Sequence, residues 1–104
     1  MKHYPEQGSV IELEQNKLRA LVLSKNMFNA TGLSIVCPIK EKANPDALHI
    51  SVNVGGKENY ALIEHMRSLD LSARYYRVIG CIAYEEIQEI TDAAQSIFDY
   101  YPFG

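Results

Sequence analysis

Side chains able to transfer a proton and to bind an anion lie five residues apart in one segment, at Glu14 and Arg19. A carboxylate placed as a general acid or base typically contributes ~10² to 10⁴ in rate, and an Arg fork offers two parallel donors to a phosphate. The same segment also fits an ordinary strand surface, because Val10, Glu12 and Glu14 alternate along the chain and Lys17 could be a solvated partner. The residue types alone leave both interpretations open.

A second set of polar residues follows two apolar runs further along the chain. Lys40 could bind a phosphate as a point charge, or it could simply begin the charged loop at residues 40–42. His65 could stack on a base or shuttle a proton, because the unperturbed pKa of histidine is near neutral, or it could be a polar residue at a strand end. The other histidines, His3 and His49, belong to no recognisable constellation of chemical groups.

Length and composition predict one globular domain, residues 1–104, because 104 residues with 47% hydrophobic content are enough for one core and too few for two. The apolar runs are much shorter than a membrane span and the N-terminus has no apolar signal segment, so we expect a cytoplasmic protein without a membrane partner. Cys37 and Cys81 lie in apolar strand-like runs, which favours buried free thiols over a disulfide. Neither has a second Cys or His at metal-ligand spacing, so no metal site is expected.

The net charge of −3 argues against a protein that coats nucleic acid nonspecifically. The charge is unevenly distributed, because residues 85–99 hold five acidic side chains and no Lys or Arg. The rest of the chain has ten basic and eight acidic side chains, a balance of +2. A locally basic face is therefore compatible with the acidic overall composition.

Periodicity predicts short strands followed by one helix. Runs rich in β-branched and aliphatic residues, separated by turn residues, indicate strands at residues 10–13, 18–23, 33–39, 48–54, 60–63 and 76–82. Gly55-Gly56 predicts a hairpin, and residues 29–32 and 42–46 have loop chemistry. Apolar residues at helical spacing predict an amphipathic helix over residues 84–99. The expected fold is mainly β, a small barrel or curled antiparallel sheet with a C-terminal helix packed on it.

Four segments, taken in order, resemble the MazF/PemK family of bacterial toxins, which are small RNA-cutting proteins. The segments are Glu14-Gln15 with the following Arg19, then Ala20-Leu21-Val22-Leu23-Ser24, then Phe28 to Ile39, and then Met66-Arg67-Ser68-Leu69-Asp70-Leu71-Ser72-Ala73-Arg74. The resemblance covers roughly residues 4–98. It implies an SH3-like small barrel of antiparallel strands with a C-terminal α-helix, working as a homodimer whose interface shapes the substrate groove.

For the reaction, the resemblance implies sequence-specific, metal-independent cleavage of single-stranded RNA by attack of the 2′-hydroxyl, without a cofactor. Glu14 would do the acid or base work, and Arg19 would stabilise the charged phosphate. RNA contacts would come from Lys17, Ser24, Lys40, Glu64, His65 and Arg67. The expected partner besides RNA is a cognate antitoxin, whose acidic and partly disordered segment would occupy the basic groove.

The chain departs from the family pattern close to the expected site. Ala20 follows Arg19 where the family usually has a Pro. Either that Pro is deleted, or the match shifts by one residue and places Leu18 at the Arg position. The family also carries a longer loop before its Glu-Gln pair, whereas this chain runs almost directly from Gly8 to Glu14. These two differences bear on whether the catalytic Arg is present.

Two other interpretations follow from such departures. A catalytically silent relative that keeps the fold as a binding module is supported by the shortened loop, the missing Pro, and Lys40 at a position where the family typically has a hydroxyl residue. A gyrase-poisoning toxin resembling CcdB, which shares this fold, is suggested by the aromatic tail from Tyr100 to Gly104. The internal segments favour RNA cleavage over the CcdB-like action.

Overall fold

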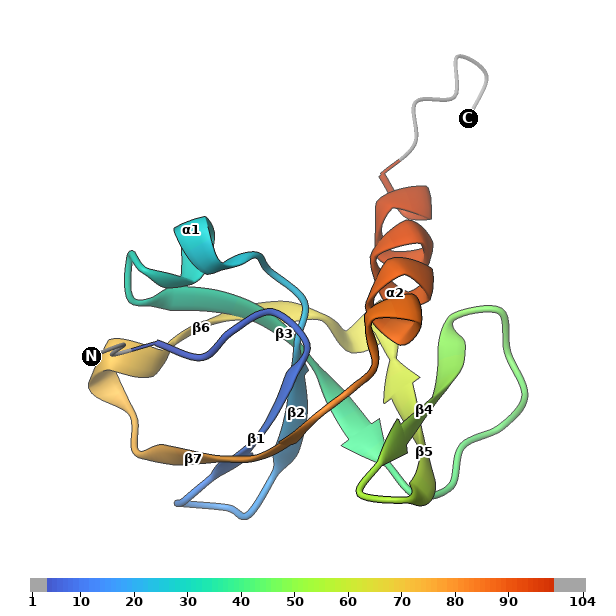
Figure 1. Ribbon diagram of the computed structural model, residues 1–104, viewed down its shortest axis with the longest axis horizontal. Coiled ribbons are helices and arrows are strands. Elements are labelled where there is room, and N and C mark those ends of the chain that lie inside the picture. The colour runs from blue at the N-terminus through green and yellow to red at the C-terminus, as the bar shows by residue number, and fades with distance from the viewer. Residues whose placement is uncertain (1–3, 99–104) are drawn as a thin grey trace.

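The computed structural model describes residues 4–98 as a curled antiparallel sheet with a helix against one side (Figure 1). The strands are β1 (Ser9–Leu13), β2 (Arg19–Val22), β3 (Leu33–Lys40), β4 (His49–Val54), β5 (Lys57–Leu62), β6 (Arg67–Asp70) and β7 (Tyr76–Cys81). The helices are α1 (Asn26–Asn29) and α2 (Tyr84–Ser96), and 3₁₀ turns cover Ile63–His65 and Leu71–Ala73. The mainly β fold with a C-terminal helix, predicted from the sequence, is confirmed.

The strands form a seven-stranded sheet in the order β4-β5-β3-β2-β1-β7, and β6 pairs with β3 away from this path. β3 takes part in both halves of the sheet, since residues 33–36 pair with β6 whereas Ile39 and Lys40 pair with β5. The pairings among the described strands are antiparallel. In Figure 1, β1, β2, β3, β6 and β7 surround one interior, while β4, β5 and α2 lie on the other side of β2 and β3.

The central strands carry a hydrophobic core on each face. Ile11 and Ala20 belong to the inner core, inside the barrel, whereas Val10 and Leu21 belong to the outer core, which β4, β5 and α2 complete. Val10 and Ile11 are neighbours on β1 and both are 0% exposed. Along the alternation of Val10, Glu12 and Glu14, Val10 is therefore buried in the outer core and Glu12 is partly buried, whereas Glu14 is exposed.

Two local features fix α2 against the sheet. Gly8 has a φ of +87°, which favours glycine, and an added Cβ there would lie 2.4 Å from Ile87 Cδ1, so a larger residue would displace the Ile87 side chain of α2. Glu86 accepts hydrogen bonds from the backbone N–H groups of Ala83 (3.0 Å) and Asn53 (2.7 Å). The second bond links the first turn of α2 to β4 and satisfies a donor on that strand.

Several elements differ from the sequence predictions. Residues 26–29 form the short helix α1, and the strand β6 was not predicted because it is short and only Leu69 in it is buried. The predicted hairpin is confirmed, with positive φ at Gly55 and Gly56 between β4 and β5. Cys37 is buried as expected, but the prediction for Cys81 is wrong, because this residue is exposed on β7 at the edge of the sheet.

Candidate functional site

The segment with the predicted catalytic pair is a tight turn between β1 and β2. The N–H of Leu13 donates to the carbonyl of Leu18 at 2.9 Å, which leaves residues 14–17 as the connection. Lys17 adopts a φ of 57°, a conformation that a non-glycine residue takes only at some cost. Glu14 is exposed, and its side chain has no hydrogen-bond or ion-pair partner among residues 4–98. The backbone N–H of Glu14 donates to the carbonyl of Tyr75 at 3.0 Å, so the turn is held to the segment before β7 while the Glu14 side chain is presented to solvent.

A row of polar side chains crosses the outer face of the sheet where the outer core ends. Glu12 on β1 lies opposite Arg19 on β2 and opposite Arg77 on β7. Arg77 donates to Glu12 Oε1 from Nε at 3.1 Å and from Nη2 at 2.9 Å. Arg19 donates from Nη2 to Oδ1 of the buried Asn59 on β5 at 2.9 Å. We call Glu12, Arg19, Asn59 and Arg77 the polar row.

The polar row combines a sheltered carboxylate with accessible cations. The side chain of Glu12 is only 18% exposed, whereas that of Arg77 is 73% exposed. Glu12, Glu14, Lys17, Tyr76 and Arg77 line one open pocket beside the β1–β2 turn. Partial burial raises the pKa of the Tyr76 hydroxyl. Fixed guanidinium groups on two sides of one carboxylate suit the binding of a phosphate next to a proton-transfer group.

Lys40 does not join the polar row. It ends β3 opposite Tyr60, and the neighbouring Ile39 belongs to the outer core, so the side chain of Lys40 leaves the other face of the sheet from Arg19. Its amino group has no hydrogen-bond or ion-pair partner within residues 4–98. The adjacent Glu41 pairs with Lys57 at 2.8 Å, and the hydrogen bond and charge of Lys57 lower the pKa of that carboxyl.

Ser24 lies at the opposite end of β2 from Arg19, about 16 Å away at ~3.3 Å per residue. Its hydroxyl donates to Asn29 Oδ1 at 2.5 Å and accepts from the N–H of Ile35 at 2.9 Å. Three other predicted RNA contacts also lie away from the polar row: Glu64 and His65 are in the first 3₁₀ turn, and Arg67 begins β6. Arg67 is paired in register with Val36 in the middle of β3. The sequence-predicted residues therefore fall into two groups rather than one.

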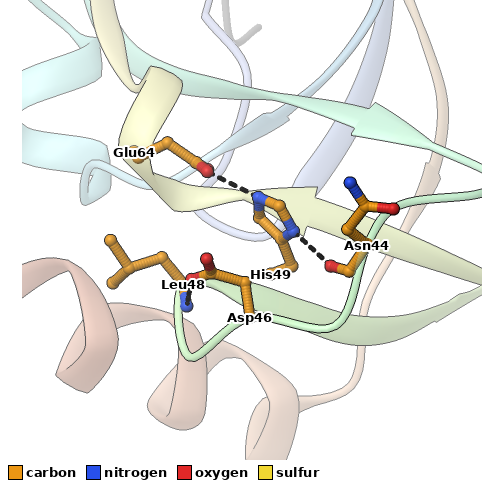
Figure 2. Close-up of polar contacts among 5 residues, drawn as sticks. All are labelled: Asn44, Asp46, Leu48, His49 and Glu64. Carbon is orange, nitrogen blue, oxygen red and sulfur yellow. Dashed lines mark hydrogen bonds and ion pairs between the residues drawn. The ribbon is translucent and has the colours of Figure 1, made fainter.

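His49 forms a constellation that the sequence interpretation missed (Figure 2). Its Nε2 lies 2.5 Å from Glu64 Oε2, and its Nδ1 lies 2.6 Å from the carbonyl oxygen of Asn44. The Asn44 carbonyl first, and the Glu64 carboxylate second, raise the pKa of His49. Both ring nitrogens donate when the ring is protonated, so His49 holds the loop of residues 41–48 against the first 3₁₀ turn. His65, the predicted candidate, is exposed and has no side-chain partner among residues 4–98.

A largely apolar groove runs between α2 and the sheet. Its lining residues come from α2 and the residues just after it, from β3, and from the chain just after β2 and just before β6, and they include Leu23, Ile35, Met66, Ala94 and Phe98. The groove lies beside Ser24 and Met66, and thus near the second group of predicted residues. Phe98 is 75% exposed at its open end.

No three His, Cys, Asp or Glu side chains within residues 4–98 gather in a way that could hold a metal ion. In the same part of the chain, neither helix has the length and apolar character that crossing a membrane requires. The aromatic segment from Tyr100 to Gly104, on which the CcdB-like interpretation rests, lies outside the described residues.

Comparison with known proteins gives consistent matches in sequence and in structure. Residues 5–98 match the model of the PemK-like, MazF-like toxins of type II toxin–antitoxin systems. The endoribonuclease toxin ChpB of Escherichia coli (strain K12) is 29% identical over 85 residues, covering 77% of this chain and 73% of ChpB. A chain in the crystal structure of MazE-MazF (Form-I) from Deinococcus radiodurans has a TM-score of 0.82 at 25% identity, covering 93% of this chain and 98% of that one.

A second structural relative shows the fold alone, because its identity is low. It is a mycobacterial endoribonuclease in complex with its cognate antitoxin, with a TM-score of 0.77 at 14% identity, covering 94% of this chain and 99% of that one. The family model spans the barrel, the polar row and α2. The chain therefore belongs to the PemK-like, MazF-like toxin family of type II toxin–antitoxin systems.

Proposed function

We propose that this toxin is a metal-independent endoribonuclease that cleaves single-stranded RNA by attack of a 2′-hydroxyl on the adjacent phosphate. The observation that carries the proposal is the polar row, in which a carboxylate lies directly opposite Arg19 and is held by a second Arg. A phosphate undergoing such attack gains negative charge, which fixed guanidinium donors stabilise more in the transition state than in the ground state.

Arg19, rather than Leu18, fits the role of the phosphate-stabilising residue. Arg19 is the first residue of β2, and its guanidinium is oriented by Asn59 while other donors of the fork stay available. Leu18 packs against the inner core, so no polar group at that position could reach the outer face. This supports the alignment in which the family Pro after the Arg is deleted.

The remaining predicted residues have separate places in the proposed reaction. Glu14 and Lys17 lie at the pocket beside the polar row, where they could contact the reacting nucleotide. Lys40 would meet the RNA backbone on the other side of β3. Glu64, His65 and Arg67, with Ser24 nearby, would contact nucleotides further along the strand. A strand of RNA covering both groups would need several nucleotides, which is compatible with sequence-specific cleavage.

The proposed partners are single-stranded RNA, a second copy of the chain and an antitoxin. Two relatives in the comparisons were crystallised with an antitoxin, MazE in one of them. A segment rich in Asp and Glu would compete with RNA for Arg19, Arg77 and Lys17, because both ligands are polyanions. We propose a homodimer, whose sedimentation at micromolar concentration should exceed that of a monomer.

The test of the proposed function is incubation of the pure protein with a long RNA of mixed sequence in EDTA, followed by mapping of both ends. Products with 2′,3′-cyclic phosphate and 5′-hydroxyl ends are expected, because a 2′-oxygen nucleophile needs no metal-bound water. Cleavage that is abolished by EDTA and restored by magnesium would contradict the mechanism. Absence of cleavage, together with no growth arrest on expression, would favour the silent relative.

Substitution of Arg19 tests the site itself. Arg19→Lys keeps one charge but loses the fork, and removing a preorganised donor of this kind typically lowers the rate ~10² to 10³-fold. Arg19→Ala should be at least as damaging. Arg74→Lys, the same change at an exposed residue after the second 3₁₀ turn, is the matched control and should cut at the wild-type rate. Equal cleavage by the wild type and Arg19→Lys would end this assignment.

A further inference from the structure

We propose that Glu12, rather than Glu14, takes the proton from the attacking 2′-hydroxyl, and that Arg77 is the residue that positions it. The proposal rests on the proposed endoribonuclease function and names the carboxylate of that site. Sequence resemblance points to Glu14, which is two residues further along the chain. The observations that favour Glu12 are its register, its hydrogen bonds and its partial burial.

Register places Glu12 beside Arg19. The two residues are Cα partners in the β1–β2 ladder, and directly opposed residues have Cβ atoms about 4.5 to 5.5 Å apart on one face. A phosphate bound by the Arg19 fork would therefore lie within reach of the Glu12 carboxylate. Glu14 is beyond the last β1–β2 pair, in the turn of residues 14–17, where its backbone N–H is bonded to Tyr75 but its exposed side chain is not held beside Arg19.

Hydrogen bonds hold Glu12 in one orientation and leave an acceptor free. Both bonds from Arg77, from Nε and from Nη2, end on Oε1. The Oε2 atom has no donor among residues 4–98, so it can accept the proton of a hydroxyl. A proton-transfer group works best when it is held within ~0.5 Å of the productive geometry, and a paired carboxylate on a strand meets that need better than a free one in a turn.

Burial separates the two carboxylates further. Glu12 is 18% exposed at the end of the outer core, whereas Glu14 belongs to the exposed class. Electrostatic interactions weaken as solvent enters, so the attraction between the half-buried Arg19 and a phosphate is stronger beside Glu12 than it would be in the exposed turn. The negative charge that develops on the phosphate in the transition state would thus lie beside the partly buried Glu12 and not in the exposed turn.

The step balances without a co-reactant other than water. The 2′-oxygen forms a bond to phosphorus, and its proton passes to Glu12 Oε2. The bond between phosphorus and the 5′-oxygen breaks, and the leaving oxygen takes a proton from water. The products are a 2′,3′-cyclic phosphate and a 5′-hydroxyl, and Glu12 later returns its proton to solvent. No group is oxidised or reduced.

Two single substitutions with the same chemical change separate the assignments. Glu12→Gln keeps a side-chain oxygen that can accept the bonds from Arg77, so the variant should fold, but it cannot take up a proton at that position. We expect single-turnover cleavage of the mixed-sequence RNA to fall at least ~10²-fold, with RNA affinity and melting temperature close to the wild type. Glu14→Gln should lose much less activity. Glu89→Gln, on the exposed side of α2, is the matched control.

Each outcome decides the matter. Glu12→Gln at the wild-type rate, or a larger loss from Glu14→Gln than from Glu12→Gln, overturns the inference while the endoribonuclease function stands. No cleavage by the wild type overturns both. Glu12→Asp keeps a carboxylate and should retain more activity than Glu12→Gln; the reverse order would indicate a packing role and also overturn the inference. Arg77→Met removes the two hydrogen bonds that orient the Glu12 carboxylate, and it should lower the cleavage rate more than it weakens RNA binding.

Discussion

Replacing Asn29 by Ala should remove a large part of the stability of the fold. Asn29 is 1% exposed and makes four hydrogen bonds. Its Nδ2 donates to the carbonyls of Pro5 (3.0 Å) and Ser24 (2.9 Å), and its Oδ1 accepts from the hydroxyls of Ser24 (2.5 Å) and Ser34 (2.9 Å). One side chain thus joins the segment before β1, the end of β2, α1 and β3.

The expected magnitude follows from these bonds. A typical buried hydrogen bond contributes about 1 kcal/mol net to the free energy of unfolding. Partners left unpaired add a further penalty, which is smaller where water can enter the cavity and bond to them. Asn29→Ala should therefore lower the free energy of unfolding by about 3 to 5 kcal/mol. For a domain near 100 residues each kcal/mol lowers the melting temperature by about 4 to 8 °C, which gives a decrease of roughly 12 to 40 °C. Asn29→Asp should be at least as damaging, because a carboxylate would then face two carbonyl oxygens.

The assay is urea unfolding followed by far-UV circular dichroism, at one fixed protein concentration because dimerisation would make stability depend on it. Asn26→Ala is the matched control: Asn26 is exposed and its Oδ1 accepts one bond, from the N–H of Gln7 at 2.9 Å. That change should cost at most about 1 kcal/mol. If Asn29→Ala costs no more than Asn26→Ala, then the buried network does not hold these segments together and the reasoning is wrong.

Three further outcomes are expected. Gly8→Ala should cost about 2 to 4 kcal/mol in urea unfolding, because it combines a positive φ with a contact of 2.4 Å to Ile87; a loss below ~1 kcal/mol would show that α2 can shift. The pKa of His49 in the folded protein is raised above 6.5, so the stability contributed by its protonated ring is full below that pH and is lost as pH rises through the folded-state pKa. The destabilisation by His49→Gln should therefore be larger near about pH 6 than near about pH 9. Equal losses at the two pH values would contradict this. Iodoacetamide should label exposed Cys81 and spare Cys37, whose pKa burial raises to about 12, with mass spectrometry of peptides as the readout; equal labelling would refute the burial of Cys37.

The sequence predicts the fold well because the signals for it are local. Alternating apolar residues mark strands, Gly55-Gly56 marks the hairpin, and the helical spacing of Ile87 and Ile90 marks α2. No local pattern predicts β6, because only one of its four side chains is buried and the strand is defined by its pairing with β3. Such strands are defined by their partners rather than by their own composition.

The candidate site was harder to predict because its contacts join residues that are far apart in the chain. Arg19 and Asn59 are separated by 40 positions, Glu12 and Arg77 by 65, and no spacing rule relates such residues. His49 and Glu64 are 15 positions apart and meet because β4 and β5 pair around the hairpin. The one available signal was the alternation that includes Glu12, and along it the residues change from buried Val10 to exposed Glu14.

The position of the polar row follows from the two cores. On the outer face of β1 and β2 the pair Val10 and Leu21 is fully buried, and the next pair on that face is Glu12 and Arg19. The polar row therefore begins where the outer core no longer covers the sheet. Its charged side chains are next to buried apolar residues on one side and accessible to a ligand on the other. A longer β1–β2 loop could cover this edge, and its reduction to residues 14–17 leaves the edge accessible. Under the proposed mechanism the shortened turn removes a cover rather than the reacting groups, because Glu12 and Arg19 are positioned by strand pairing and not by the loop.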